Sequence, residues 1–174
     1  MTSRERVRAA VNHETPDRTP IDMGSTPVSG ISASTYSKLR TALGLPKKAV
    51  RVCEPYQMLG EVEQEVRCLL GIDTVPVSMP GTLLGFRNEG WKPWRLFDGT
   101  DVMVPEKFMT TSDENGGLNI YPQGDTSVPP SAHMPNGGYY FDSIVRQELV
   151  DEDNLDPEDW MDDFMSVLTD EDLS

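Results

Sequence analysis

The sequence predicts an α/β protein in which helices alternate with short strands and β-hairpins follow. Three observations support this class. Residues 1–89 show helical apolar spacing broken by short β-branched runs, residues 90–145 hold two strong hairpin turns, and residues 146–174 have the spacing of an amphipathic acidic helix. With 174 residues the chain is long enough to form one domain around a hydrophobic core.

The first predicted element is a helix with a capping box. Thr2 stands three residues before Glu5, so each side chain can accept a hydrogen bond from a free backbone N–H at the helix start. Val7, Ala10 and Val11 recur at helical spacing and mark the face that we expect to be buried.

A short strand is expected next. Pro16 and Pro20 prevent the helix from continuing, and Pro-Ile-Asp-Met at 20–23 gives a short extended run. Gly24 allows the backbone to turn tightly after it. We therefore expect the first strand to end at this glycine.

Two further helices and a second strand are predicted before residue 78. Tyr36 begins a helical apolar pattern that Gly44 ends. Another helix is expected to start at Pro55 and to end at Gly71, and Ile-Asp-Thr-Val-Pro-Val at 72–77 then predicts a strand. The apolar stripe of this third helix consists of Met58, Leu59, Val62, Val66, Leu69 and Leu70.

The hairpin region and the acidic end have distinct local signals. Asp98-Gly99 and Asn115-Gly116 are turn dipeptides between β-forming runs. Near the end, Asp156 and Pro157 are typical of a helix start, before an apolar face that includes Trp160 and Phe164. Thr169 and Asp172 resemble a further capping box, so we expect these residues to be the N-terminal portion of a longer protein.

Charge and composition exclude several classes of function. The net charge is −14, and residues 148–174 contain no Lys or Arg, which argues against nucleic-acid binding because phosphates are bound by clustered cations. Apolar runs fall far short of the roughly 20 residues that span a membrane, and no signal peptide precedes them, so a cytoplasmic location is expected. His13 and His133 lack neighbouring Cys or Glu at ligand spacing, so we expect no metal site in this segment.

Three stretches together resemble a known family. "SRERVRAAVNHETPDRTPIDMG", "YSKLRTALGL" and "GEVEQEVRCLLGIDTVPVSMPG" occur in the order found at the amino terminus of the uroporphyrinogen decarboxylase superfamily, which also includes cobalamin-associated methyltransferases. The resemblance implies the N-terminal part of a (β/α)8 TIM barrel. Residues 1–89 would supply its first β/α units, residues 90–145 an inserted β-hairpin region, and residues 146–174 a helix that returns to the barrel.

The resemblance also suggests candidate site residues. Gly24, Ser25 and Thr26 would lie at the barrel mouth as substrate-binding residues. Asp73 matches an aspartate that faces the pyrrole nitrogens in the decarboxylases, although an acid after a helix-ending glycine often only caps a turn. Asp22 is a second candidate catalytic acid, facing either the barrel interior or the covering helices.

Two further features qualify that site. His133, beside a proline-rich loop, is either a surface residue or a substrate-binding acid–base group. The decarboxylases carry arginines after the first strand that bind propionates, whereas this chain has "MGSTPVSG" and no arginine there. Because Ser and Thr cannot replace bidentate arginine contacts, this absence argues against a porphyrinogen substrate.

Three functions remain open at the level of sequence. The first is corrinoid-dependent methyl transfer in the full-length form, with zinc and a corrinoid as cofactors and a corrinoid protein or small methyl carrier as partner. The second is decarboxylation of a tetrapyrrole or smaller carboxylic acid. The third is a catalytically incomplete scaffold or interaction module. No nucleic-acid or membrane partner is expected, and a homodimer is left open.

Overall fold

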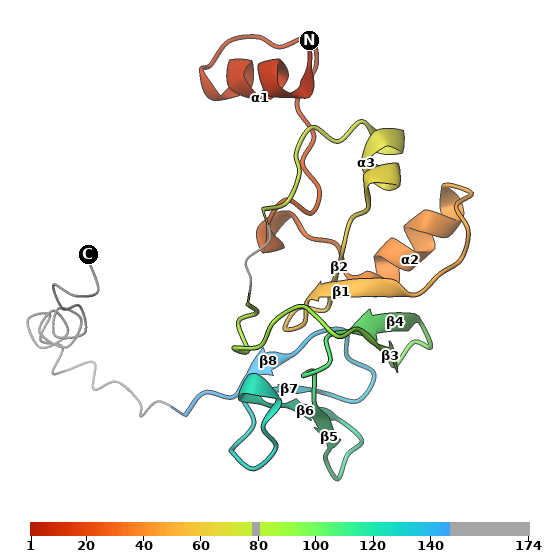
Figure 1. Ribbon diagram of the computed structural model, residues 1–174, viewed down its shortest axis with the longest axis vertical. Helices are drawn as coiled ribbons and strands as arrows, with labels where there is room; N and C mark the ends of the chain where they lie inside the picture. The colour runs from red at the N-terminus through yellow and green to blue at the C-terminus, as the bar shows by residue number, and fades with distance from the viewer. Residues whose placement is uncertain (78–80, 147–174) are drawn as a thin grey trace, which may run out of the picture. The chain divides into compact units, whose positions relative to one another are not determined.

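The computed structural model describes residues 1–77 and 81–146, so the acidic helix expected over 146–174 lies, apart from its first residue, outside the described residues. Met1–Ile144 form one compact unit. Figure 1 shows its elements in chain order. They are α1 (Ser3–Val11), η1 (Pro27–Ser29), α2 (Ala33–Ala42), β1 (Val50–Glu54), β2 (Leu59–Gly60), α3 (Gln64–Leu70), β3 (Lys92–Arg95), β4 (Asp101–Val104), β5 (Thr110–Ser112), β6 (Leu118–Ile120), η2 (Pro122–Gly124), β7 (Ala132–Met134) and β8 (Asp142–Ser143).

The first sheet joins the early part of the chain to the first hairpin. Its strand order is β2-β1-β4-β3, with β1 parallel to β4 and the other pairs antiparallel. Along β1 the burial alternates, so that Val50 and Val52 face the core. The β3–β4 hairpin turns at Asp98-Gly99 as predicted, with Gly99 at a φ of +83°.

The second sheet is antiparallel throughout, with the order β5-β6-β7-β8. The predicted turn at Asn115-Gly116 connects β5 to β6, and Gly116 has a φ of +77°. The Asp113 carboxylate fixes this turn by accepting hydrogen bonds from the backbone N–H groups of Asn115 and Gly117, each at 2.8 Å.

One hydrophobic core contains buried side chains from α2 and from both sheets. Tyr36 of α2 is 1% exposed and packs with the valines of β1 and β4. Phe108 contacts Trp94 of β3 and Phe141, both edge to face, at centroid distances of 5.3 and 6.1 Å. Because Phe141 directly precedes β8, this aromatic chain connects the two sheets.

The predicted fold class, the N-terminal part of a (β/α)8 TIM barrel, is wrong. Within the described residues there are three α-helices and two small, mostly antiparallel sheets, and no barrel closes. Barrel strands are buried on both faces, whereas β1 alternates between buried and exposed residues and pairs with the hairpin strand β4. The β3–β4 hairpin is therefore part of the first sheet, and the β5–β6 hairpin belongs to the second.

Several predicted elements also differ from the structure. The runs 20–23 and 72–77 form no ladder, and each contains a proline, which cannot donate to one. The third helix begins at Gln64, because Leu59 and Gly60 pair with β1 instead. On α1 the capping box is confirmed, but the buried residues are Arg6 and Ala9. Among the described residues no helix combines the length and apolarity needed to cross a membrane.

Candidate functional site

The two candidate catalytic acids lie on adjacent segments. The Asp73 N–H donates to the Ile21 carbonyl at 2.8 Å, and the Ile21 N–H donates to the Asp73 carboxylate at 2.9 Å. One residue further along each segment, the Thr74 hydroxyl donates to the Asp22 carboxylate at 2.5 Å. Two stretches that carry the family resemblance, residues 20–22 and 72–74, are thus held side by side.

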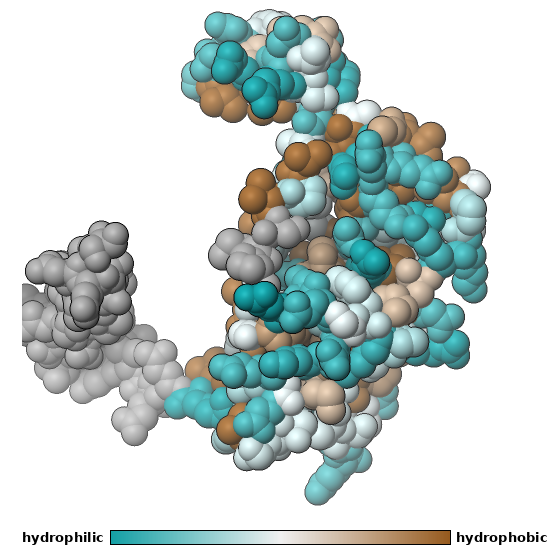
Figure 2. Space-filling view, viewed as in Figure 1, coloured by the Kyte–Doolittle hydropathy of each residue, from teal (hydrophilic) through white to brown (hydrophobic). Residues whose placement is uncertain are grey.

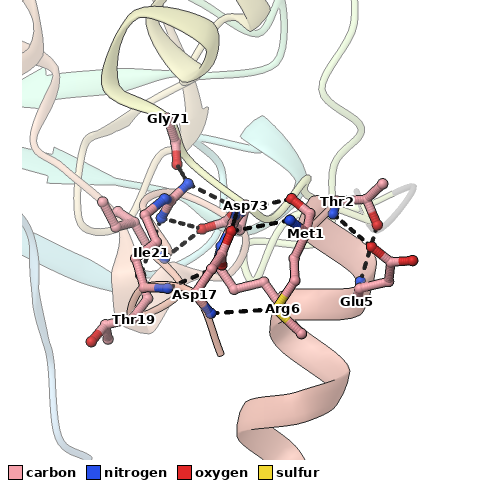
Figure 3. Close-up of polar contacts among 10 residues, drawn as sticks. Met1, Thr2, Glu5, Arg6, Asp17, Thr19, Ile21, Gly71 and Asp73 are labelled. Atoms are coloured by element: carbon pink, nitrogen blue, oxygen red, sulfur yellow. Dashed lines mark hydrogen bonds and ion pairs between the residues drawn. The ribbon is translucent and has the colours of Figure 1, made fainter. Parts of the chain in front are cut away.

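Asp73 is the centre of an ionic cluster that attaches α1 to the rest of the unit (Figure 3). Its side chain is 0% exposed and accepts from Arg6 Nη1 at 2.6 Å and from Arg18 Nη1 at 2.8 Å. Arg6 also donates through Nε to Asp17 at 2.6 Å. We call Arg6, Asp17, Arg18 and Asp73 the Asp73 cluster.

These contacts determine the protonation of Asp73. The Ile21 N–H lowers the pKa of the Asp73 carboxyl most, burial opposes this, and the arginines lower it further, so that the pKa lies well below its usual range. Both carboxylate oxygens already accept hydrogen bonds. Asp73 is therefore an ionised anchor at neutral pH and is poorly suited to transfer a proton.

Asp22 has a comparable structural role. Burial opposes its ionisation, but hydrogen bonds from Ser25 and Thr74 hold the pKa of Asp22 below its usual value. Gly24 is also structural, because its φ is +80° and a Cβ there would lie 2.6 Å from Val62 Cγ2. Asp22 and Gly24 thus shape the turn that carries Ser25 and Thr26.

An open groove of about 810 Å³ lies beside the Asp73 cluster, between α1 and the segments 25–26 and 73–77. The side chains of Arg4 and Arg8, one helical turn apart, have no hydrogen-bond or ion-pair partner among the described residues. Val11 and Val75 are 72% and 67% exposed. We call this the α1 groove; its lining residues are Arg4, Val7, Arg8, Val11, Asn12, Ser25, Thr26, Asp73, Thr74, Val75 and Val77.

The groove combines apolar and cationic surface. Figure 2 shows hydrophobic residues along one edge of the α1 region, with hydrophilic residues above them. Exposed valines on both sides favour contact with an apolar body, and two unpaired guanidinium groups favour carboxylates. The face of α1 that the sequence predicted to be buried is therefore a wall of this groove.

The remaining candidate, His133, belongs to a different region. It lies on β7, where its Nε2 contacts the Asp113 carboxylate at 2.6 Å, and His133 is the largest cause of the lowered pKa of Asp113. It is not among the residues that line the α1 groove. Its observed role is to fasten the β5–β6 turn to β7.

The described residues contain no group of metal-ligating side chains, and comparison of the chain with known proteins finds no relative. In the described ranges, no three His, Cys, Asp or Glu side chains are grouped so that they could hold a metal ion. Comparison of the chain with family models, with curated proteins and with solved structures gives no match. The family resemblance therefore remains a prediction.

Sequence reasoning missed the arginines on both sides of the site. Arg6 and Arg18 reach Asp73 across separations of 67 and 55 residues, which no local pattern reveals. Arg4 and Arg8 could have been found, because they share a helical face with Val7 and Val11 in a mixed cationic and apolar pattern.

Proposed function

We propose that this chain binds an amphipathic carboxylate in the α1 groove and contributes ligand recognition rather than acid–base catalysis. The observation that carries this proposal is the pair Arg4 and Arg8, exposed and unpartnered within the described residues, above exposed valines. An acid–base role for Asp73 is disfavoured, because its carboxylate oxygens already accept hydrogen bonds from two arginines and a backbone amide.

The ligand class that fits best is a tetrapyrrole with several carboxylates. A groove of about 810 Å³ lies within the usual range of roughly 300–1,000 Å³ for small-molecule sites. The flat ring would cover the valines, and the carboxylates would reach Arg4 and Arg8. The arginines that "MGSTPVSG" lacks would thus be provided by α1. A cytoplasmic setting is part of the proposal and agrees with the unpaired thiols of Cys53 and Cys68.

A corrinoid is the second candidate, as expected for a methyltransferase-like chain. Asn12, Ser25, Thr26 and Thr74 give the groove a neutral hydrogen-bonding side, which suits the carboxamide rim of a corrinoid. In that case a corrinoid protein or a small methyl carrier would be the partner. This ligand would depend little on the two arginines.

A ligand series separates these alternatives. We would titrate the protein with coproporphyrin, with methylcobalamin, and with a cationic tetrapyridyl porphyrin as the control for ring stacking without carboxylates, following absorbance and fluorescence. Saturable binding of coproporphyrin alone is the expected result. Preference for methylcobalamin would favour the second candidate. If the cationic porphyrin binds as tightly as coproporphyrin, or if none of the three ligands binds, the groove is not a carboxylate site. That result would favour an interaction module.

A further inference from the structure

Two turns at one end of the second sheet have the same sequence, Asn-Gly-Gly. They are Asn115-Gly116-Gly117 between β5 and β6, and Asn136-Gly137-Gly138 between β7 and β8. Elsewhere in the sequence no asparagine precedes a glycine. An asparagine before glycine is prone to deamidation, because the next backbone nitrogen can attack its side-chain carbonyl and glycine has no side chain to obstruct the approach. Since the reacting residues are identical, the fold decides which turn reacts.

The two turns contact each other through Asn136. Its Nδ2 donates to the Asn115 carbonyl at 3.3 Å, and a Cβ on Gly116 would lie 3.1 Å from the same nitrogen. Asn115, Gly116, Asn136 and Gly137 are all exposed. Water therefore reaches both turns, and exposure does not distinguish them.

Hydrogen bonding does distinguish them. In the first turn the Gly116 N–H donates to the Asp113 carbonyl at 3.2 Å. In the second turn the Gly138 N–H donates to the Pro135 carbonyl at 2.8 Å, whereas the Gly137 N–H has no acceptor among the described residues. No atom outside its chain neighbours lies within 4 Å of the position that a Cβ on Gly137 would take. The nitrogen that must attack is thus bonded in the first turn and free in the second.

The Asp113 carboxylate gives the first turn further protection. It accepts from the N–H groups of Asn115 and Gly117, which flank the Gly116 nitrogen, and so holds the turn in one conformation. The contact with His133 lowers the pKa of Asp113, which keeps this carboxylate ionised at neutral pH. A negative charge beside an amide opposes the loss of its proton, and that loss is needed before the nitrogen can attack.

We propose that Asn136 is a modification site at which the protein deamidates spontaneously, and that it reacts faster than Asn115. The Gly137 nitrogen loses its proton to hydroxide or water and attacks Asn136 Cγ, the bond from Cγ to Nδ2 breaks, and ammonia leaves. Water then opens the cyclic imide. Opening at the main-chain carbonyl gives isoaspartate, and opening at the side-chain carbonyl gives aspartate. The sum is asparagine and water converted to either acid and ammonia.

The modified turn would lose its contact with the first turn. A carboxylate accepts hydrogen bonds but cannot donate one, so the bond to the Asn115 carbonyl disappears. Isoaspartate also adds a methylene to the main chain shortly before Phe141, which is 1% exposed and contacts Phe108. We therefore expect the modification to loosen β8 and its packing on the core.

The test incubates the whole protein at mildly alkaline pH in water enriched in heavy oxygen and follows both asparagines by peptide mass spectrometry. Each deamidation incorporates labelled oxygen, and fragmentation distinguishes isoaspartate from aspartate. We expect Asn136 to react about two- to tenfold faster than Asn115, the factor for an amide hydrogen bond that must first be broken. In urea the two rates should become nearly equal. Equal rates in the folded protein, a faster Asn115, or a difference that persists in urea would overturn the proposal.

Asp113→Ala is the second test, because it removes the carboxylate that holds the first turn and keeps Asn115-Gly116. Asn115 should then react severalfold faster. Asp125→Ala is the matched control, since Asp125 holds Ser127 in a turn elsewhere in the chain, and it should leave both rates unchanged. An Asn115 rate that is the same in the two variants would contradict protection by the turn. The comparison of buffer with urea decides the proposal even where Asp113→Ala does not fold.

Discussion

Arg8→Gln is the most informative change in the α1 groove, because it removes a charge without shortening the side chain much. Arg8 is exposed and has no ion pair among the described residues, so its loss should not disturb the fold. An exposed charge pair contributes about 0.5–1 kcal/mol. Arg8→Gln should therefore weaken coproporphyrin binding about two- to fivefold.

The double variant Arg4→Gln, Arg8→Gln should lose about 1–2 kcal/mol, or about 5- to 30-fold in affinity, and most of the salt dependence of binding. The assay is fluorescence titration at low and high salt. Arg95→Gln on β3 is the matched control, because this arginine is exposed but outside the groove. An equal loss in the control, or an unchanged double variant, would refute the proposed contact.

Three further predictions concern stability. Asp73→Asn should lower the melting temperature and make stability depend less on pH in the acid range. The depressed pKa of Asp73 gives stabilisation that is complete above its unfolded pKa near 3.8 and is lost as pH falls toward the folded pKa. A urea midpoint of the unsubstituted protein that does not change between pH 6 and about 2.5 would contradict this. Phe108→Ala should cost about 3–5 kcal/mol in one cooperative transition, and separate transitions by circular dichroism and tryptophan fluorescence would argue against a shared core. Gly24→Ala should cost more than about 1 kcal/mol, and more than Gly99→Ala, where positive φ is the only obstacle; equal urea midpoints would exclude the close contact with Val62.

Local chemistry made part of this fold predictable. Thr2 and Glu5 form the capping box that their spacing predicts, and Asp98-Gly99 and Asn115-Gly116 form hairpin turns. Each of these signals acts over a few residues, because the side chain or the glycine itself satisfies the backbone geometry. Sequence alone is sufficient for such elements.

Long-range pairing was not predictable in the same way. Leu59 matches the helical stripe, yet it pairs with Glu54 of β1 and forms a bridge to Ser32, which lies much earlier in the sequence. The valines of residues 72–77 are equally compatible with a paired strand and with an extended segment that pairs with no sheet, which is what the structure shows. The predicted barrel failed because it rested on strands whose partners no local pattern specifies.

The candidate site was predicted in part. Ser25, Thr26 and Asp73 do line one groove, while His133 fastens a distant hairpin. The chemistry assigned to Asp73 depended on what surrounds it, and its arginine partners come from separate segments. A carboxylate in a sequence motif has no fixed role until those partners are known.

The most direct test of carboxylate binding in the α1 groove is amide chemical-shift mapping with coproporphyrin. We predict that saturation shifts the amides of α1 and of Thr74, Val75 and Val77 and leaves those of β5–β8 unchanged. Shifts confined to the hairpin aromatics, with α1 unaffected, would contradict the proposed function.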